Sequence, residues 1–179
     1  NRFLKAELRY CDGHLHRIGG EAELARRRTD TASQQFTEAV SAFREAAELR
    51  RDWPDPFLGL ARVFIYGLGD IDRATDAIRE AKRLGYTPGD RETAQFADGY
   101  RARGDSLWRT ARQLVDLPQE QEYLQRATEA YKQAHDLYER IPAFPGVAAN
   151  LRRVTRAMEQ IAERAQERAA IEGLTDPWR

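Results

Sequence analysis

One pattern of large and small apolar residues occurs three times in this chain and limits the folds that it can form. Each copy has a large, a small, a large and a small residue, separated by three, four and three positions. The copies are Phe36, Ala39, Phe43 and Ala46; Ile71, Ala74, Ile78 and Ala81; and Leu124, Ala127, Tyr131 and Ala134. This spacing puts each copy on one face of an α-helix, and the small residues let a second helix approach closely. The pattern predicts an all-α protein built from helix pairs.

Composition agrees with a helical array and argues against some partners. Of the 179 residues, 41% are hydrophobic and 32% are charged, which is typical of arrays whose helix pairs have much solvent-facing surface. Basic and acidic residues number 29 each, so the net charge of zero argues against a broad surface for nucleic acid or an anionic membrane. No apolar run approaches the roughly 20 residues that cross a bilayer. We expect no nucleic-acid partner, no direct membrane insertion and a cytoplasmic location.

The basic residues are almost all arginine, because Lys5, Lys82 and Lys132 are the only lysines. A GC-rich genome produces this bias without functional meaning. The use of arginine to bind carboxylates produces it as well, since a planar guanidinium donates two parallel hydrogen bonds to a carboxylate. The sequence leaves both explanations open.

Glycines, prolines and capping residues divide the chain into helical segments. Gly19 and Gly20 are expected to interrupt the first helix, because glycine in a helix interior costs up to about 1 kcal/mol relative to alanine. No segment shows the period of two that is typical of a strand. The expected helices cover about 2–17, 21–28, 31–51, 55–66, 71–85, 91–117, 118–140 and 147–171.

Several helix ends have recognisable caps. Thr31 and Gln34 have the spacing of a capping box at the start of a helix, and Asp70 is a favourable N-cap residue. Gly173 and Pro177 are expected to end the last helix. That helix has a single apolar stripe among arginine, glutamate and glutamine, as a terminal capping helix should.

The helix pairs resemble tetratricopeptide repeats, in which a unit of about 34 residues forms one helix-turn-helix. Phe36 and Ile71 are 35 residues apart, which is close to one repeat. Ala61 matches the family's small first-helix residue, and one residue is inserted in the turn before Ile71. The segments Tyr10-Cys11-Asp12-Gly13 and Phe96-Ala97-Asp98-Gly99 share one pattern, so Cys11 and Ala97 match Ala61. The resemblance covers about residues 4–140.

The resemblance implies a right-handed α-solenoid formed by one domain, residues 1–179. Its repeats are expected at about 2–53, 54–87 and 88–142, followed by a capping helix at about 144–172. The outer repeats carry about 15 to 17 more residues than the middle one between the small residue and the second-helix motif. Their helix pairs are therefore expected to be several turns longer. Whether the longer parts bind a partner or only brace the fold stays open.

In tetratricopeptide arrays the first helices line a groove that receives a peptide or a partner helix. The resemblance implies that Lys5, Leu8, Asp12, Leu15, His16, Leu58, Arg62, Ile65, Tyr66, Arg91, Ala94, Asp98 and Arg101 line such a groove here. The cations among them suit a carboxylate, and the apolar members suit an apolar contact. The family's chaperone-binding members clamp a carboxylate with lysine and asparagine, but Asn1 and Asn150 are the only asparagines and match neither position.

Each groove residue has an alternative role in an ion pair within the chain. The sequence suggests pairs such as Asp12 with Arg62, or Arg62 with Asp98. Trp53 is expected to pack in the turn between repeats. These internal roles and the binding roles are both left open.

The first helix has an apolar stripe of Leu4, Leu8, Cys11 and Leu15, in which Cys11 is expected to be buried. Cys11 and His14 are three positions apart and Asp12 and His16 are four apart, so each pair shares a helix face. The two pairs point about 100° apart, whereas zinc requires three or four convergent ligands. We therefore expect no metal site and no cofactor.

Catalytic patterns are missing from the sequence: it has no GxSxG, Walker-type loop, HExxH or GxGxxG, and His135 is isolated on a helix. The expected function is a non-catalytic adaptor or scaffold module that binds a protein or peptide. The alternatives are a homo-oligomeric module, such as a homodimer, and a regulatory or sensor domain of a larger protein such as a kinase. Because the sequence starts at Asn1, we expect it to be part of a longer or processed protein.

Overall fold

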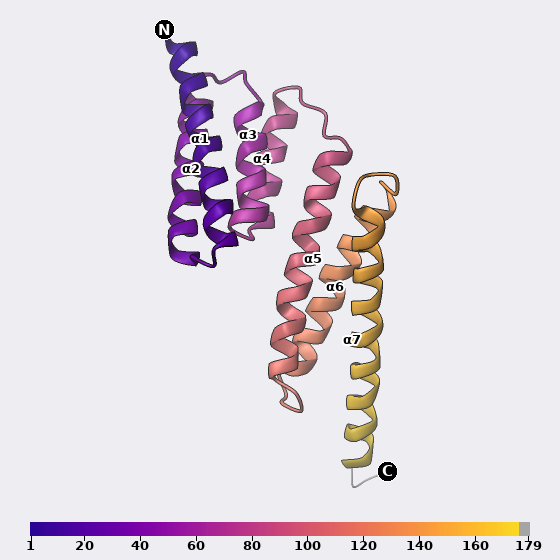
Figure 1. Cartoon of the computed structure of the whole chain (residues 1–179). Helices are drawn as coiled ribbons and strands as arrows, with labels where there is room; N and C mark the ends of the chain where they lie inside the picture. The colour runs from indigo at the N-terminus through magenta and orange to yellow at the C-terminus, as the bar shows by residue number, and fades with distance from the viewer. Residues whose placement is uncertain (176–179) are drawn as a thin grey trace. The chain divides into compact units, whose positions relative to one another are not determined.

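The fold is all-helical, as the sequence predicts. A computed structural model describes the backbone of residues 1–175 and the side chains of residues 1–171. Within that part the chain forms seven α-helices and one π-helical turn and no strand (Figure 1). Among the described residues, no helix combines the length and apolarity needed to cross a membrane. The expected end of the last helix at Gly173 is wrong, because that helix continues to Thr175. Pro177, the other residue expected to end it, lies outside the described residues.

The helices fall into two compact units, Asn1–Gly89 and the part from Asp90 onward. The outer helix pairs are longer than the middle one, as expected: α1 and α2 have 24 and 21 residues and α5 and α6 have 24 and 20, but α4 has 13. The first unit contains α1 (Arg2–Ala25), α2 (Thr29–Leu49), α3 (Asp55–Arg62), the π-helical turn η1 (Val63–Gly67) and α4 (Ile71–Arg83). The second contains α5 (Asp90–Gln113), α6 (Glu120–Glu139) and α7 (Val147–Thr175).

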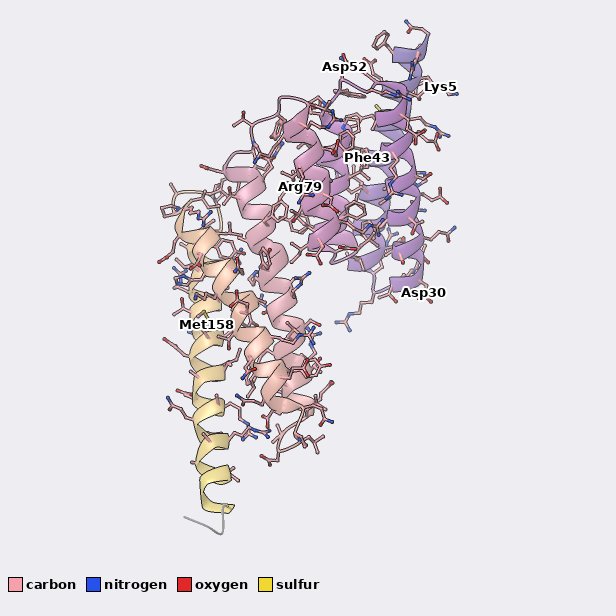
Figure 2. All side chains as sticks on the ribbon, turned by 180° about the vertical axis from the view of Figure 1, so that it is seen from behind. Lys5, Asp30, Phe43, Asp52, Arg79 and Met158 are labelled. Atoms are coloured by element: carbon pink, nitrogen blue, oxygen red, sulfur yellow. The ribbon has the colours of Figure 1, made fainter. Side chains whose placement is uncertain are left out.

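The repeated large–small motif forms the packing faces of α2, α4 and α6. Every residue of its three copies is buried. In α2 the large residue Phe43 lies among the helices of the first unit (Figure 2). A Cβ atom added at Gly13 of α1 or at Gly59 of α3 would lie 2.7 Å from the Phe43 ring. The ring therefore contacts two helix backbones directly, which only glycine permits at this distance.

Phe36, seven residues before Phe43 in α2, also contacts two glycine backbones. Cβ atoms added at Gly20 of α1 and at Gly67 of η1 would lie 2.6 and 2.7 Å from its ring. The predicted break at Gly19 and Gly20 is therefore wrong, since α1 is one continuous helix through both glycines. The contact between Phe36 and the α1 backbone offsets the low helix propensity of Gly20.

The spacing of these contacts accounts for the π-helical turn. The two phenylalanines are seven residues apart, as are their glycine contacts in α1, but Gly59 and Gly67 are eight apart. The turn η1 takes up the extra residue, and the amide of Leu68 donates to the carbonyl of Val63 at 3.1 Å, five residues back. The sequence places an inserted residue in the following turn, whereas the structure accommodates an extra residue within the helix.

Neighbouring glycines of α1 are expected to respond in opposite ways to substitution by alanine. Gly20→Ala should lower the free energy of unfolding by about 1–3 kcal/mol, because its Cβ would overlap the buried Phe36 ring. Gly19→Ala should be neutral or raise it by up to about 1 kcal/mol, since its Cβ meets only the movable end of Gln35. Urea unfolding of both variants checks this. Equal gains would show that helix propensity, and not contact with the Phe36 ring, decides the effect, and equal losses would contradict the difference between the two sites.

Two predicted helix starts have different outcomes. Asp70 caps α4 as expected, because its carboxylate accepts a hydrogen bond from the amide of Arg73 at 3.0 Å. The capping box at Thr31 and Gln34 is wrong, since α2 already begins at Thr29 and has no side-chain cap. Arg27 has a φ of 60°, so the left-handed turn after α1 starts α2 earlier than the sequence suggests.

The core of the second unit lies between α6 and its neighbours. Tyr131 of α6 packs against Gly104 of α5, where an added Cβ would lie 2.8 Å from the ring. Val154 and Ile161 of α7 are buried against this core, and Met158 is partly buried beside them (Figure 2). The single apolar stripe predicted for the last helix is confirmed.

Candidate binding groove in the second unit

A groove with a volume of about 500 Å³ lies in the second unit. Its walls come from α5 and α7, and Tyr131 contributes from α6. The α5 wall contains Asp105, Trp108, Arg109 and Arg112, and the α7 wall contains Ala149, Arg152, Arg153, Arg156, Ala157 and Gln160. We refer to this surface as the α5–α7 groove.

The charge of the α5–α7 groove is strongly positive. Five lining residues are arginine and one is aspartate, which gives a formal charge of +4 (five minus one). The aspartate, Asp105, already accepts hydrogen bonds from Arg153 at 2.7 Å, from Arg101 at 3.3 Å and from the Tyr131 hydroxyl at 2.7 Å. The single carboxylate of the lining is thus used to hold the helices together.

The other four arginines of the groove have no such partner. Among the described residues, no carboxylate forms an ion pair with Arg109, Arg112, Arg152 or Arg156. All four are exposed, and the Arg112 guanidinium lies 5.5 Å from the centre of the Trp108 ring. These side chains can therefore donate hydrogen bonds to an anion without breaking a contact to an acidic side chain of the unit.

Two tyrosines of α6 donate hydrogen bonds to two aspartates of α5, and one of these pairs lines the groove. Tyr131 donates to Asp105, and Tyr138 donates to Asp98. Burial, followed by the hydrogen bond to the aspartate, raises the pKa of each tyrosine, so both stay protonated donors at neutral pH. Asn150 of α7 also donates to Asp98 at 3.2 Å, which ties the third helix into the network.

The structure gives different roles to the site residues predicted on α5. Asp98 and Arg101 are brought together, but inside the network, where Arg101 donates to the Tyr138 hydroxyl at 3.3 Å. Ala94 is buried in the core and cannot line a groove. Arg91 is exposed and forms an ion pair with the neighbouring Glu92 at 2.8 Å.

The residues predicted on α3 and η1 are only partly available. Ile65 is buried, so its prediction as an apolar groove residue is wrong: the π-helical turn directs it into the core. Leu58 is half-buried and Tyr66 is exposed. Arg62 lies 5.6 Å from the centre of the Tyr66 ring and 3.8 Å from the carboxylate of Glu21.

The residues predicted on α1 have local partners or are exposed. Asp12 forms an ion pair with Arg9 at 3.3 Å, so the suggested pair of Asp12 with Arg62 is not the one that forms. His16 is 2.9 Å from the side-chain oxygen of Gln35. Lys5 is exposed at the surface of the first unit (Figure 2).

The predicted apolar stripe of α1 is exposed rather than buried. Leu4, Leu8, Leu15 and Ile18 keep 57%, 59%, 67% and 53% of their surface accessible. Cys11, expected to be buried, is exposed as well. The α2 phenylalanines select the glycine-containing face of α1, because leucines there would prevent the close approach. The leucine stripe is left on the opposite face.

The polar residues near Cys11 do not converge on one point. His14 packs edge-on against Tyr10 and Phe43, with ring centres 4.5 and 5.0 Å away. Burial, then the charges of Arg17 and Arg62, lowers the pKa of His14. The His14 ring thus belongs to the aromatic core, which also includes Trp53 at 4.7 Å from Tyr10, as the predicted packing of Trp53 requires.

His135 is less isolated than the sequence suggests. Its Nδ1 atom is 3.6 Å from the Glu139 carboxylate and 3.9 Å from that of Asp136. All three lie within one turn of α6, and the two carboxylates are exposed. Such a turn is an ordinary surface arrangement of a charged helix.

Comparisons with known proteins found no matching family model, no matching curated protein and no matching solved structure. The tetratricopeptide resemblance thus depends on the residues of this chain alone. The α5–α7 groove, which that resemblance does not contain, depends on the contacts of α5, α6 and α7.

Proposed function

We propose that this chain is a non-catalytic protein-binding module and that the α5–α7 groove holds a segment of its partner. The observation that carries the proposal is the group of four exposed arginines around one groove with no acidic partner among the described residues. Several other surface arginines form an ion pair one turn away, as Arg83 does with Glu80 at 2.9 Å. The groove differs in that four arginines without an acidic partner in the described part of the chain lie on the walls of one surface.

The chemistry of the lining favours recognition over catalysis. Arginine stays charged at all physiological pH values, so it suits binding and not proton transfer. Asp105 is occupied by three donors, and the pKa of Tyr131 is raised by its burial. Trp108, Ala149 and Ala157 add apolar surface for a partner's side chains.

We also propose that α1–α2, α3–α4 and α5–α6 are tetratricopeptide-like repeats of a right-handed solenoid, with α7 as the capping helix. Support comes from the equivalent use of the large–small motif, which is buried on the second helix of each pair. The longer outer pairs and the π-helical turn in the middle pair are then departures from the family pattern.

A second candidate function, self-association, is favoured by the exposed stripe on α1. Leu4, Leu8, Leu15 and Ile18, together with Cys11, are spaced by alternating steps of four and three, as in helices that pack side by side over several turns. In this case copies of the chain, and not a different protein, cover α1.

Affinity capture with matched double variants tests the proposed function. Immobilised wild-type protein, Arg152→Gln/Arg156→Gln and Arg79→Gln/Arg83→Gln are exposed to a lysate of the source organism. Arg79 and Arg83 are also four positions apart and exposed, and Arg79 projects from α4 (Figure 2). We expect a protein that wild type and the α4 variant retain and the groove variant loses.

Other outcomes of the capture separate the candidates. A protein retained equally by all three would show that the α5–α7 groove is not the binding site. Capture of the chain's own copies alone, unchanged in the groove variant, would favour self-association through α1.

A further inference from the structure

The guanidinium groups of the α5–α7 groove that lack a carboxylate partner among the described side chains are free to bind an anion, and the groove is elongated along α7. From Ala149 to Gln160 the lining of α7 covers eleven residue steps, or about 16 Å along the helix. An extended chain advances about 3.3 Å per residue, so this length matches about five residues of peptide. A single small anion would occupy only part of it.

The four arginines without a described acidic partner lie on both walls of the groove. Arg109 and Arg112 belong to α5, and Arg152 and Arg156 belong to α7. Successive side chains of an extended peptide point in opposite directions. A run of acidic residues lying between the helices would therefore present carboxylates to both walls at once, and each carboxylate can accept two hydrogen bonds from one guanidinium.

The positive charge of the groove is local and is balanced by acidic residues elsewhere in the unit. Residues 90–171 contain 13 basic and 13 acidic side chains, so this part has a net charge of zero (13 minus 13), against +4 in the groove lining. A nucleic acid carries phosphates along its whole length and is bound by broad basic surfaces. A short acidic peptide matches a local positive groove better, since its charges end where the arginines end.

We propose that the α5–α7 groove binds an extended acidic peptide segment, about five residues long and rich in aspartate or glutamate. The inference rests on the proposed function, because it names the chemistry of the partner that the module holds. Arg109, Arg112, Arg152 and Arg156 bind the carboxylates, and Asp105 fixes Arg153 beside them.

Peptide binding to the full chain tests this inference. Fluorescently labelled hexaglutamate, hexaglutamine and hexalysine are titrated with the protein, and anisotropy is measured at low and at physiological salt. We expect hexaglutamate alone to bind, more weakly at higher salt because charge pairing is screened. Arg152→Gln/Arg156→Gln and, on the other wall, Arg109→Gln/Arg112→Gln should each weaken binding about tenfold or more. Arg79→Gln/Arg83→Gln should not change it.

Several results would overturn the inference. If hexaglutamine binds as tightly as hexaglutamate, the groove does not recognise acidic side chains. If both groove variants still bind hexaglutamate, the acidic peptide binds elsewhere on the protein. Tighter binding of pyrophosphate or of a short RNA, lost in the same variants, would assign the groove to phosphate groups instead. Thermal unfolding of each variant checks that it is folded. We expect all groove variants to fold, because the replaced arginines are exposed and form no ion pair with another described residue of the unit.

Failure of the inference is distinguishable from failure of the proposed function. Suppose that capture of a protein requires Arg152 and Arg156 but hexaglutamate does not bind. The proposed protein-binding function would then be supported, and the proposed acidic segment would be refuted. Hexaglutamate binding that needs these arginines, with capture unaffected by their loss, would support the acidic-segment site and refute the groove as the site of protein binding.

Discussion

Glu120→Gln is expected to lower the free energy of unfolding of the second unit by about 3 kcal/mol or more. The Glu120 side chain is fully buried at the start of α6, with 0% of its surface exposed. Its carboxylate accepts hydrogen bonds from Arg164 at 2.6 and 3.0 Å, from Arg168 at 3.1 Å and from the amide of Asp116 at 2.9 Å. Glutamine keeps the shape of the side chain but leaves the two guanidinium groups without its charge.

The same contacts predict how acid changes the stability of the unit. Hydrogen bonds from Arg164, then those from the Asp116 amide and Arg168, lower the pKa of Glu120 from 4.5 to about 2 although burial opposes this. The pKa in the folded state is below that of the unfolded chain, so the contribution of Glu120 is present above pH 4.5 and is lost as the pH falls toward 2. The difference between wild type and Glu120→Gln should shrink over this interval.

Glu122→Gln is the matched control for this experiment, because Glu122 is exposed and lies two residues further along α6. Its effect on unfolding should stay below about 0.5 kcal/mol at all pH values. Urea unfolding followed by Trp108 fluorescence, in a background that carries Trp53→Phe and Trp178→Phe, reports on the second unit. A gap between wild type and Glu120→Gln that stays constant from pH 6 to pH 2.5, within the range set by the pKa of Glu120, would contradict the account of this carboxylate.

Phe43→Ala is expected to lower the free energy of unfolding of the first unit by about 4 kcal/mol. The Phe43 ring has 0% of its surface exposed and fills the space between the glycine backbones of α1 and α3. Its loss leaves a cavity with helix backbone on two sides, and backbone cannot move in to fill it as flexible side chains would.

Phe3→Ala serves as the control for Phe43, because Phe3 keeps 57% of its surface exposed. Its effect should be below about 0.5 kcal/mol. Both variants are compared by urea unfolding in a background that carries Trp108→Phe and Trp178→Phe, so that Trp53 fluorescence reports on the first unit. Similar losses for the two phenylalanines would show that Phe43 does not fill the centre of the unit.

The sequence was sufficient for the parts of the fold that local patterns determine. The large–small motif correctly identified the buried faces of α2, α4 and α6, and Asp70 correctly marked the start of α4. Both signals lie within one helix, so their meaning does not depend on which element packs against them.

The orientation of α1 was not predictable in the same way. Leucines at helical spacing indicate a buried stripe, and paired glycines indicate a break, yet α1 buries Gly13 and Gly20 and exposes Leu8 and Leu15. The reason is a contact between distant residues: the rings of Phe36 and Phe43 need a helix surface without side chains. No local pattern of α1 contains that information.

The binding groove was missed for a related reason. Arg109 and Arg152 are 43 positions apart (152 minus 109), and each looks like an ordinary surface residue in its own helix. Only the packing of α5 and α7 around Tyr131 brings their side chains to one groove. The near absence of lysine was the one available signal, and it was equally compatible with genome composition.

The most direct test of the central claim is the amount of partner protein retained from one lysate by wild type and by the two arginine pairs. The account predicts that Arg152→Gln/Arg156→Gln loses the partner and that Arg79→Gln/Arg83→Gln retains it at the wild-type level. Retention of the same protein by both variants would contradict the assignment of protein binding to the α5–α7 groove.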